Sequence, residues 1–115
     1  MKVIDTETLV RLLDVEAERR RILTNNLANL DTPGYRTARL DFKQALNRTL
    51  EAGERDDGFE TEIVHPNFHS SDQSGNNVTL GREVTELNRN SLRTETFLEY
   101  LKFRKRMTRA AIQGK

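Results

Sequence analysis

Residues 25–36 read Asn-Asn-Leu-Ala-Asn-Leu-Asp-Thr-Pro-Gly-Tyr-Arg, and they decide where the chain changes direction. Within them, Thr32-Pro33-Gly34-Tyr35 predicts a tight turn, because proline fixes φ at the second position and glycine allows a positive φ at the third. A residue before proline disfavours helical geometry, so the preceding helix should end near residue 30 or 31.

Asparagines cluster at this predicted helix end, at positions 25, 26 and 29. The Pro-Gly pair already stops the helix, so the asparagines should have an additional role. An asparagine side chain both donates and accepts hydrogen bonds, and it can bond the last carbonyls that a helix leaves unpaired. C-capping and local turn stabilisation are both open for each of them taken singly.

The chain before this stretch predicts one helix over residues 6–30. Leucines and one charged pair recur at alternating spacings of four and three residues, which places them on one stripe. The stripe consists of Leu9, Leu13, Glu16, Arg20, Leu23, Leu27 and Leu30, widened by Leu12, Val15 and Ile22. Because Glu16 and Arg20 lie four residues apart, we expect them to pair with each other or with a neighbouring helix.

Residues 79–112 predict a second long helix with the same alternation, which is the spacing of a coiled-coil seam. Its stripe consists of Leu80, Val84, Leu87, Ser91, Thr94, Leu98 and Leu101. Phe97, Phe103 and Met107 extend the apolar surface sideways.

The middle of the chain predicts a short helix over residues 37–53 and a long flexible loop over residues 54–77. Asp41 is the expected N-cap of the helix, and its apolar face should dock on the first helix. The loop has no sustained period and should become ordered only on contact with a partner. Within it, residues 59–64 could form a short strand or hairpin.

The predicted fold is all-α, with the two long terminal helices forming an antiparallel coiled-coil-like hairpin in a single domain over residues 1–115. Each apolar stripe is too wide to be covered within a two-helix unit, so the leftover surface should pack against other subunits. A head-to-tail contact of that kind generates helical assemblies.

The composition predicts a chain that is marginal as a monomer, since 35% of its residues are apolar and 32% are charged. A formal net charge of +1 argues against nucleic acid and membranes as partners. Cysteine is absent, which excludes disulfides. The first residues lack the apolar core of a secretory signal, and no apolar run suits a membrane span, so we expect neither.

Charges are nevertheless segregated along the chain. Acidic residues predominate between Glu51 and Glu62, whereas only basic charged residues occur from Lys102 onward. This segregation suggests a contact between the basic end of one subunit and the acidic loop of its neighbour. Raised salt should then weaken self-association of the purified protein.

No constellation of residues indicates a cofactor, a metal or catalysis. His65 and His69 lie four apart, but Pro66 between them breaks the helical spacing that would bring them together. Structural zinc needs four ligands, which this segment does not supply. There is neither a nucleophile elbow nor a glycine-rich phosphate loop, so we expect no enzyme.

The run from Asn26 to Tyr35 resembles the N-terminal signature of bacterial flagellar axial proteins, in which an Asn-x-x-Asn pair precedes Thr-Pro-Gly-Tyr. That family builds the rod, the hook and the hook-filament junction. Proximal rod proteins are the nearest match, because Asn77-Val78 followed by Leu80, Glu83 and Leu87 resembles the opening of their C-terminal helix. The chain is also short, whereas hook and distal rod proteins carry large inserted domains. The tyrosine expected soon after Leu92 is absent.

The resemblance implies a structural subunit of the basal-body rod that transmits torque and lies in the periplasm after export without a cleaved signal peptide. It implies three kinds of partner: other rod proteins, the membrane-anchored basal ring with its adaptor protein, and the flagellar type III export gate. Phe42 and Leu46 fit the short element that such a gate recognises. The expected signature and interface residues are Asn26, Asn29, Thr32, Pro33, Gly34, Tyr35, Leu23, Leu27, Val84, Leu87, Leu98 and Leu101.

The alternative is a small helical nucleic-acid-binding or regulatory module, because Phe103 is interleaved with the basic residues at the end of the second helix. A filter-binding test at low salt separates the two interpretations, since a rod subunit should show no specific retention.

Overall fold

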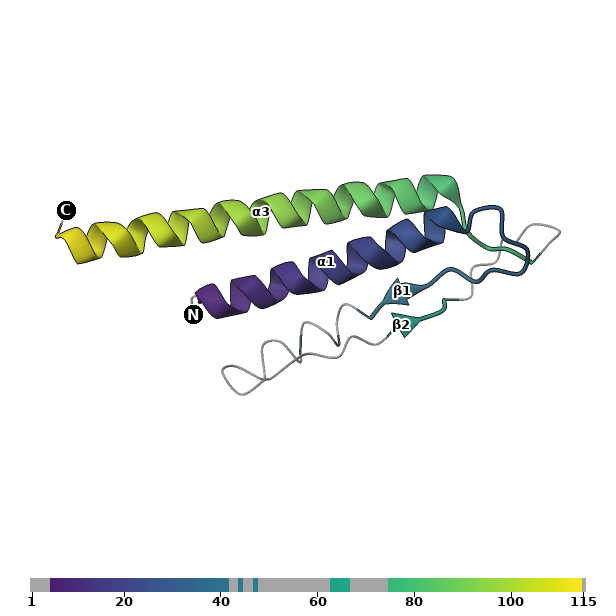
Figure 1. Ribbon diagram of the computed structural model, residues 1–115, viewed down its shortest axis with the longest axis horizontal. Coiled ribbons are helices and arrows are strands. Elements are labelled where there is room, and N and C mark those ends of the chain that lie inside the picture. Colours follow the sequence, from purple (N-terminus) through teal and green to yellow (C-terminus); the bar gives the residue numbers. More distant parts are fainter. Residues whose placement is uncertain (1–4, 42–43, 45–46, 48–62, 67–74, 115) are drawn as a thin grey trace.

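The computed structural model describes residues 5–41, 44, 47, 63–66 and 75–114. Two long helices, α1 (Thr6–Ala28) and α3 (Leu80–Gln113), lie side by side and run in opposite directions (Figure 1). A small antiparallel ribbon of β1 (Arg39–Leu40) and β2 (Ile63–Val64) lies along α1. The molecule is elongated, with extents of 65 × 26 × 23 Å. The predicted helical hairpin is therefore correct, and the all-α class needs the ribbon added.

Helix α1 begins at an aspartate cap. Asp5 has extended backbone geometry, and its carboxylate accepts a hydrogen bond from the Thr8 N–H at 2.8 Å. This bond satisfies one of the unpaired amides of the first turn. The hydrogen bonds from Thr8 also lower the pKa of Asp5 from its ordinary value, because they favour the charged carboxylate.

The helix ends at Ala28, two residues before the predicted position 30. Asn29 is the C-cap, and its side-chain amide donates to the Asn25 carbonyl at 2.8 Å. The chain then makes the predicted turn, in which the Tyr35 N–H donates to the Thr32 carbonyl at 3.2 Å and Gly34 has φ of 72°. The Pro-Gly pair therefore shapes the elbow between α1 and the ribbon.

The positive φ at Gly34 gives a direct test of the turn. Gly34→Ala should lower the free energy of unfolding by about 1–2 kcal/mol, because a Cβ disfavours the left-handed region. Gly81 is the matched control: it lies in α3 with open space around its Cα, so Gly81→Ala should stabilise by up to about 1 kcal/mol. Urea denaturation measures both, and equal effects of the two substitutions would contradict the assigned turn.

Residues 37–40 do not belong to the predicted middle helix, because they are extended and enter β1. Arg39 pairs with Val64 and Leu40 with Ile63, so the strand suggested within residues 59–64 exists at its end and pairs with β1. The Asp41 carboxylate accepts the Gln44 N–H at 3.2 Å, as an N-cap does. Residues 42–43, 45–46 and 48–53 of the predicted helix lie outside the described residues.

The apolar core lies between α1 and the ribbon. Val15 and Ile22 from α1 form one buried cluster with Ala38 and Leu40. Leu9, Leu12 and Leu23 are also buried, whereas Arg20 of the predicted stripe is exposed. Most of the predicted α1 face is therefore correct.

The face that helix α3 turns towards α1 contains three of the predicted stripe residues, Leu87, Thr94 and Leu101, and otherwise differs from the prediction. Its only buried residues are Glu83 and Asn90. Their face continues at spacings of four and three through half-buried residues: Leu87, Thr94, Phe97, Leu101 and Arg104. Leu80, Val84, Ser91 and Leu98 of the predicted stripe are exposed. The inner face is rotated by about one residue because Glu83 and Asn90 find buried hydrogen-bond partners on the α1 side.

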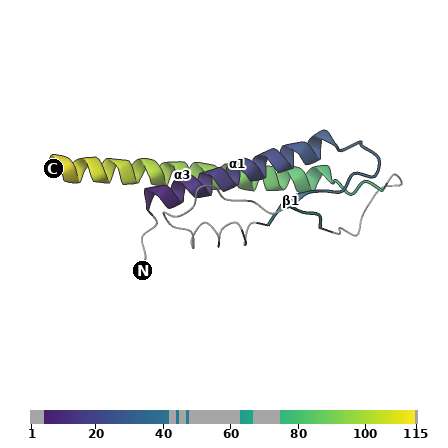
Figure 2. The same cartoon turned by 60° about the horizontal axis from the view of Figure 1, so that its bottom comes forward.

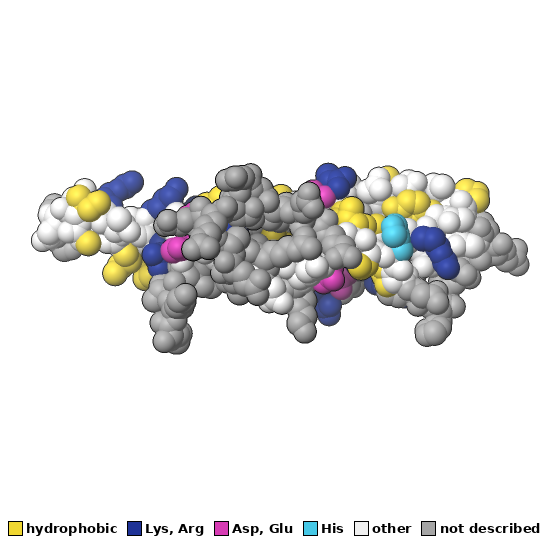
Figure 3. Space-filling view, turned by 90° about the horizontal axis from the view of Figure 1, so that it is seen from below, with side chains coloured by type: hydrophobic (Ala, Val, Ile, Leu, Met, Phe, Trp, Pro, Cys, Tyr) yellow, Lys and Arg dark blue, Asp and Glu magenta, His cyan; other side chains and the backbone are white. Residues whose placement is uncertain are grey.

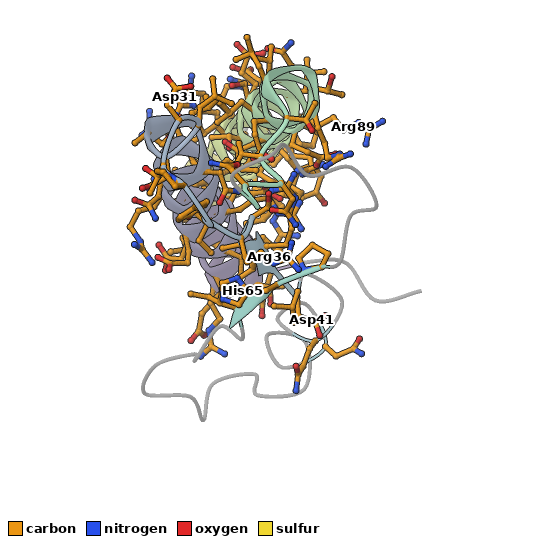
Figure 4. The ribbon with its side chains drawn as sticks, turned by 90° about the vertical axis from the view of Figure 1, so that its right-hand side faces the viewer. Asp31, Arg36, Asp41, His65 and Arg89 are labelled. Carbon is orange, nitrogen blue, oxygen red and sulfur yellow. The ribbon has the colours of Figure 1, made fainter. Side chains whose placement is uncertain are left out.

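The two helices cross at a shallow angle, and α3 extends beyond the described start of α1 (Figure 2). Viewed along the long axis, Asp31 lies on the α1 side and Arg89 projects from α3, while Arg36 and His65 lie near the ribbon (Figure 4). Within the described segments, neither helix is long and apolar enough to cross a membrane.

Candidate functional site

Asn26 is the centre of a buried polar junction at the elbow. Its side chain is fully buried, at 0% exposure. The amide nitrogen donates to the Ala38 carbonyl at 2.8 Å and to a Glu83 carboxylate oxygen at 3.0 Å. The amide oxygen accepts from the Ala38 N–H at 3.0 Å and from the Tyr35 hydroxyl at 3.2 Å. One side chain therefore connects α1, the segment leading into β1, and α3.

Glu83 carries the other half of the junction. Arg39 donates to this buried carboxylate from both terminal nitrogens, Nη1 at 3.0 Å and Nη2 at 2.7 Å. Bidentate arginine-carboxylate pairs of this kind add geometric specificity to charge attraction. The pair fixes the first turns of α3 against β1.

Asn76 ties the start of α3 to the end of α1. Its amide nitrogen donates to the carbonyls of Asn29, Leu30 and Thr32 at 2.9, 3.1 and 2.7 Å. Its amide oxygen accepts the Val78 N–H at 2.7 Å. Carbonyls of the C-cap and of the turn after α1 therefore find a donor from across the elbow.

Asn77 makes a second link to the elbow. Its amide oxygen accepts from the Thr37 N–H at 2.6 Å and from the Thr37 hydroxyl at 2.8 Å. Its own N–H donates to the Tyr35 carbonyl at 3.2 Å. Asn76 thus binds the segment before Pro33 and Gly34, and Asn77 binds the segment after them.

A second polar contact lies further along the hairpin. Glu16 is buried and accepts from Asn90 at 2.7 Å and from Arg93 Nε at 2.8 Å. Arg19 lies 3.6 Å from the same carboxylate. Burial lowers the pKa of Arg19, partly offset by the charge of Glu16. Glu16 therefore pairs with the neighbouring helix, which was one of the two predicted outcomes for it.

These contacts form a structural junction in which the buried polar groups bind one another. Among the described residues, no cluster of three or more histidine, cysteine or carboxylate side chains could hold a metal ion. His65 is exposed next to β2, and His69 lies outside the described residues.

The structure brings together much of the predicted signature. Asn26, Asn29, Thr32 and Tyr35 are joined by hydrogen bonds, and the Thr32 hydroxyl donates to the Asn29 side chain at 3.0 Å. Pro33 and Gly34 form the exposed turn. The predicted interface leucines and valine are spread over several environments: Leu23 is buried, Leu27, Leu87 and Leu101 are half-buried, and Val84 and Leu98 are exposed. Phe42 and Leu46 lie outside the described residues.

Sequence reasoning missed the roles of Thr37, Arg39, Asn76, Asn90 and Arg93. Asn90 and Arg93 lie in α3 between positions of the predicted stripe, so that stripe did not mark them as inward-facing. Thr37, Arg39 and Asn76 lie in or next to irregular segments, where no periodicity marks a buried position.

The buried junction joins both helices and the ribbon, and a family model matches this part of the chain. The model described as "Flagella basal body rod protein" matches residues 16–36, which run from Glu16 through the elbow.

Comparisons that cover more of the chain specify the family further. The chain is 33% identical over 109 residues to the flagellar basal body rod protein FlgB of Yersinia enterocolitica, covering 77% of this chain and 79% of the relative. It is 32% identical over 108 residues to FlgB of Yersinia ruckeri, covering 77% and 79%. FlgB of Bacillus subtilis strain 168 is 28% identical over 95 residues, covering 70% and 71%. The chain belongs to the FlgB family, and it is a structural subunit of the flagellar basal body rod.

Proposed function

We propose that the chain assembles axially with other rod proteins and transmits torque mechanically through their contacts. The observation that supports this is the difference between the two faces of α3: the buried side chains are polar, and large apolar side chains are exposed. Its inner face buries Glu83 and Asn90, while large apolar side chains remain on the outside: Leu92 is 63% exposed, Phe103 49% and Met107 57%. Apolar surface of this extent marks a protein contact.

In this proposal the antiparallel helices form a coiled-coil-like inner domain that lines the axial channel, and the elbow from Asn26 to Tyr35 contacts adjacent subunits. The membrane-anchored basal ring with its adaptor protein lies below, and other rod proteins lie above. The chain reaches the periplasm through the flagellar type III export gate, without a cleaved signal peptide. The acidic segment from Glu51 to Glu62, which is expected to meet the basic end of a neighbour, lies outside the described residues.

Genetic complementation tests the assembly. Cells that lack this chain should form no complete rod and should not swim, and its expression should restore both. Basal bodies purified from the complemented cells should contain the chain. Normal rods and swimming in its absence would contradict the proposal.

Limited proteolysis adds a direct physical readout. The ends of both helices should be cleaved in the isolated protein and protected in purified basal bodies, because neighbouring subunits cover them only after assembly. Equal cleavage in the two states would show that the apolar face of α3 stays uncovered.

A further inference from the structure

Helix α3 carries a second apolar stripe on the side away from α1, which we call the outer ridge. It consists of Leu92, Thr96, Tyr100, Phe103, Met107 and Ala110. The spacing of three and four residues places them on one face. All but the half-buried Ala110 are exposed, and the rings of Tyr100 and Phe103 lie with centroids 6.5 Å apart. Figure 3 shows apolar and basic side chains together on the surface towards the free end of α3.

Helix α1 carries a shallow, open hollow between side chains on its own outer side, which we call the outer groove. The groove has a volume of about 510 Å³ and is lined by Ala17, Arg20, Arg21, Thr24, Asn25 and Ala28. Alanine and threonine leave space above the backbone, and the arginines form the rim. Val10, which is exposed, continues the same face towards the N-terminus. The groove can therefore receive the large side chains of a ridge.

Charges beside the two surfaces define a direction. Along the ridge, Glu95 and Glu99 come first, followed by a basic run from Lys102 to Arg109. Along α1 the order is the same: Glu7 and Asp14 precede the arginines of the groove. An antiparallel pairing places opposite charges together at both ends, whereas a parallel pairing places like charges together.

We propose that the outer ridge of one copy packs antiparallel in the outer groove of a second copy of this chain, with Phe103 above Ala17. This inference rests on the proposed axial assembly and adds the surfaces and the polarity of its contact. Ridge and groove are different surfaces of the same molecule, so the contact is heterologous. Each bound copy offers a free ridge at one side and a free groove at the other, so the contact repeats.

Cysteine cross-linking tests the pairing, because the chain contains no cysteine of its own. Ala17→Cys and Phe103→Cys chains are expressed together in cells that lack the native chain, and purified basal bodies are oxidised. The 17–103 product should exceed each homodimeric product at least about tenfold, since a disulfide needs Cα atoms within roughly 7 Å. Ser91→Cys, on another exposed face of α3, is the control partner for Ala17→Cys and should yield little product.

The outcomes separate this inference from the proposed function. Intact rods that contain both chains but give no 17–103 product, or mainly 103–103 product, would overturn the ridge-groove pairing and leave the rod role standing. Failure of the unsubstituted chain to enter basal bodies would overturn the rod role itself.

Charge reversal provides a second test that does not depend on cysteine. Arg20→Glu with Arg21→Glu should reduce the swimming zone in soft agar severalfold, because the changes place like charges opposite Glu95 and Glu99. Adding Glu95→Arg with Glu99→Arg to the same chain should restore it. These four side chains are exposed, and Arg21 pairs with the half-buried Glu18. The melting temperature of the purified protein should therefore stay nearly unchanged. Absence of rescue at an unchanged melting temperature would overturn the pairing.

Discussion

Asn26→Ala should lower the free energy of unfolding by about 3 kcal/mol or more. The substitution removes both hydrogen bonds to the Ala38 backbone and the donor that faces Glu83. A buried polar group left without a partner costs about 1–3 kcal/mol, and this single change leaves several such groups. Urea denaturation followed by far-UV circular dichroism gives the value.

Asn25 provides the matched control for this prediction. It is the neighbouring asparagine in the same helix, but its side chain is exposed and donates to the Tyr35 hydroxyl at 3.3 Å. Asn25→Ala should therefore change stability by no more than about 0.5 kcal/mol. If both substitutions had the same small effect, Asn26 would not be the centre of the junction.

Glu83→Ala should have a comparably large effect, a loss of about 3–5 kcal/mol in the free energy of unfolding. The carboxylate is fully buried and Arg39 is largely buried, so removal of one partner takes a close opposite charge away from the other in a buried site. Arg39→Ala should be costly for the same reason. Thermal and urea denaturation of the two single variants and of the double variant measure the coupling.

The double variant decides whether the pair acts as a unit. Because the charge left uncompensated in each single variant is absent from the double variant, its loss should be well below the sum of the single losses. Simple additivity would mean that Arg39 and Glu83 contribute independently, against the bidentate geometry. Glu86→Ala is a suitable control in the same helix, since Glu86 is only half-buried and pairs with the exposed Arg89.

The helices and the elbow could be predicted from local sequence. The second helix was expected over residues 79–112 and spans Leu80–Gln113, because its amphipathic period is long and sustained. The turn at Pro33 and Gly34 was predictable because those residues restrict the backbone directly. The two-residue strands of the ribbon are too short to show an alternating pattern.

The polar junction could not be predicted from periodicity. Asn26 and Glu83 lie 57 residues apart in sequence. Both are polar residues of a type usually found on the surface, and only the tertiary fold brings them together. The prediction placed Val84 and Leu98 on the inner face, because it assumed that apolar residues face the partner helix. In the structure both are exposed, and the preceding residues, Glu83 and Phe97, lie on the inner face instead. Buried hydrogen bonds, which depend on the tertiary fold, decided the rotation of α3.

The unequal lengths of the two helices have a mechanical consequence. Helix α3 has 34 residues and α1 has 23, so one arm is longer by 34 − 23 = 11 residues, or about 16 Å. If the subunits stack as proposed, the longer α3 reaches past the end of α1, and the ends of neighbouring copies are staggered. A cross-section through the stack then passes through intact helices as well as through boundaries between subunits. Bending or twisting loads are therefore carried partly by covalent bonds.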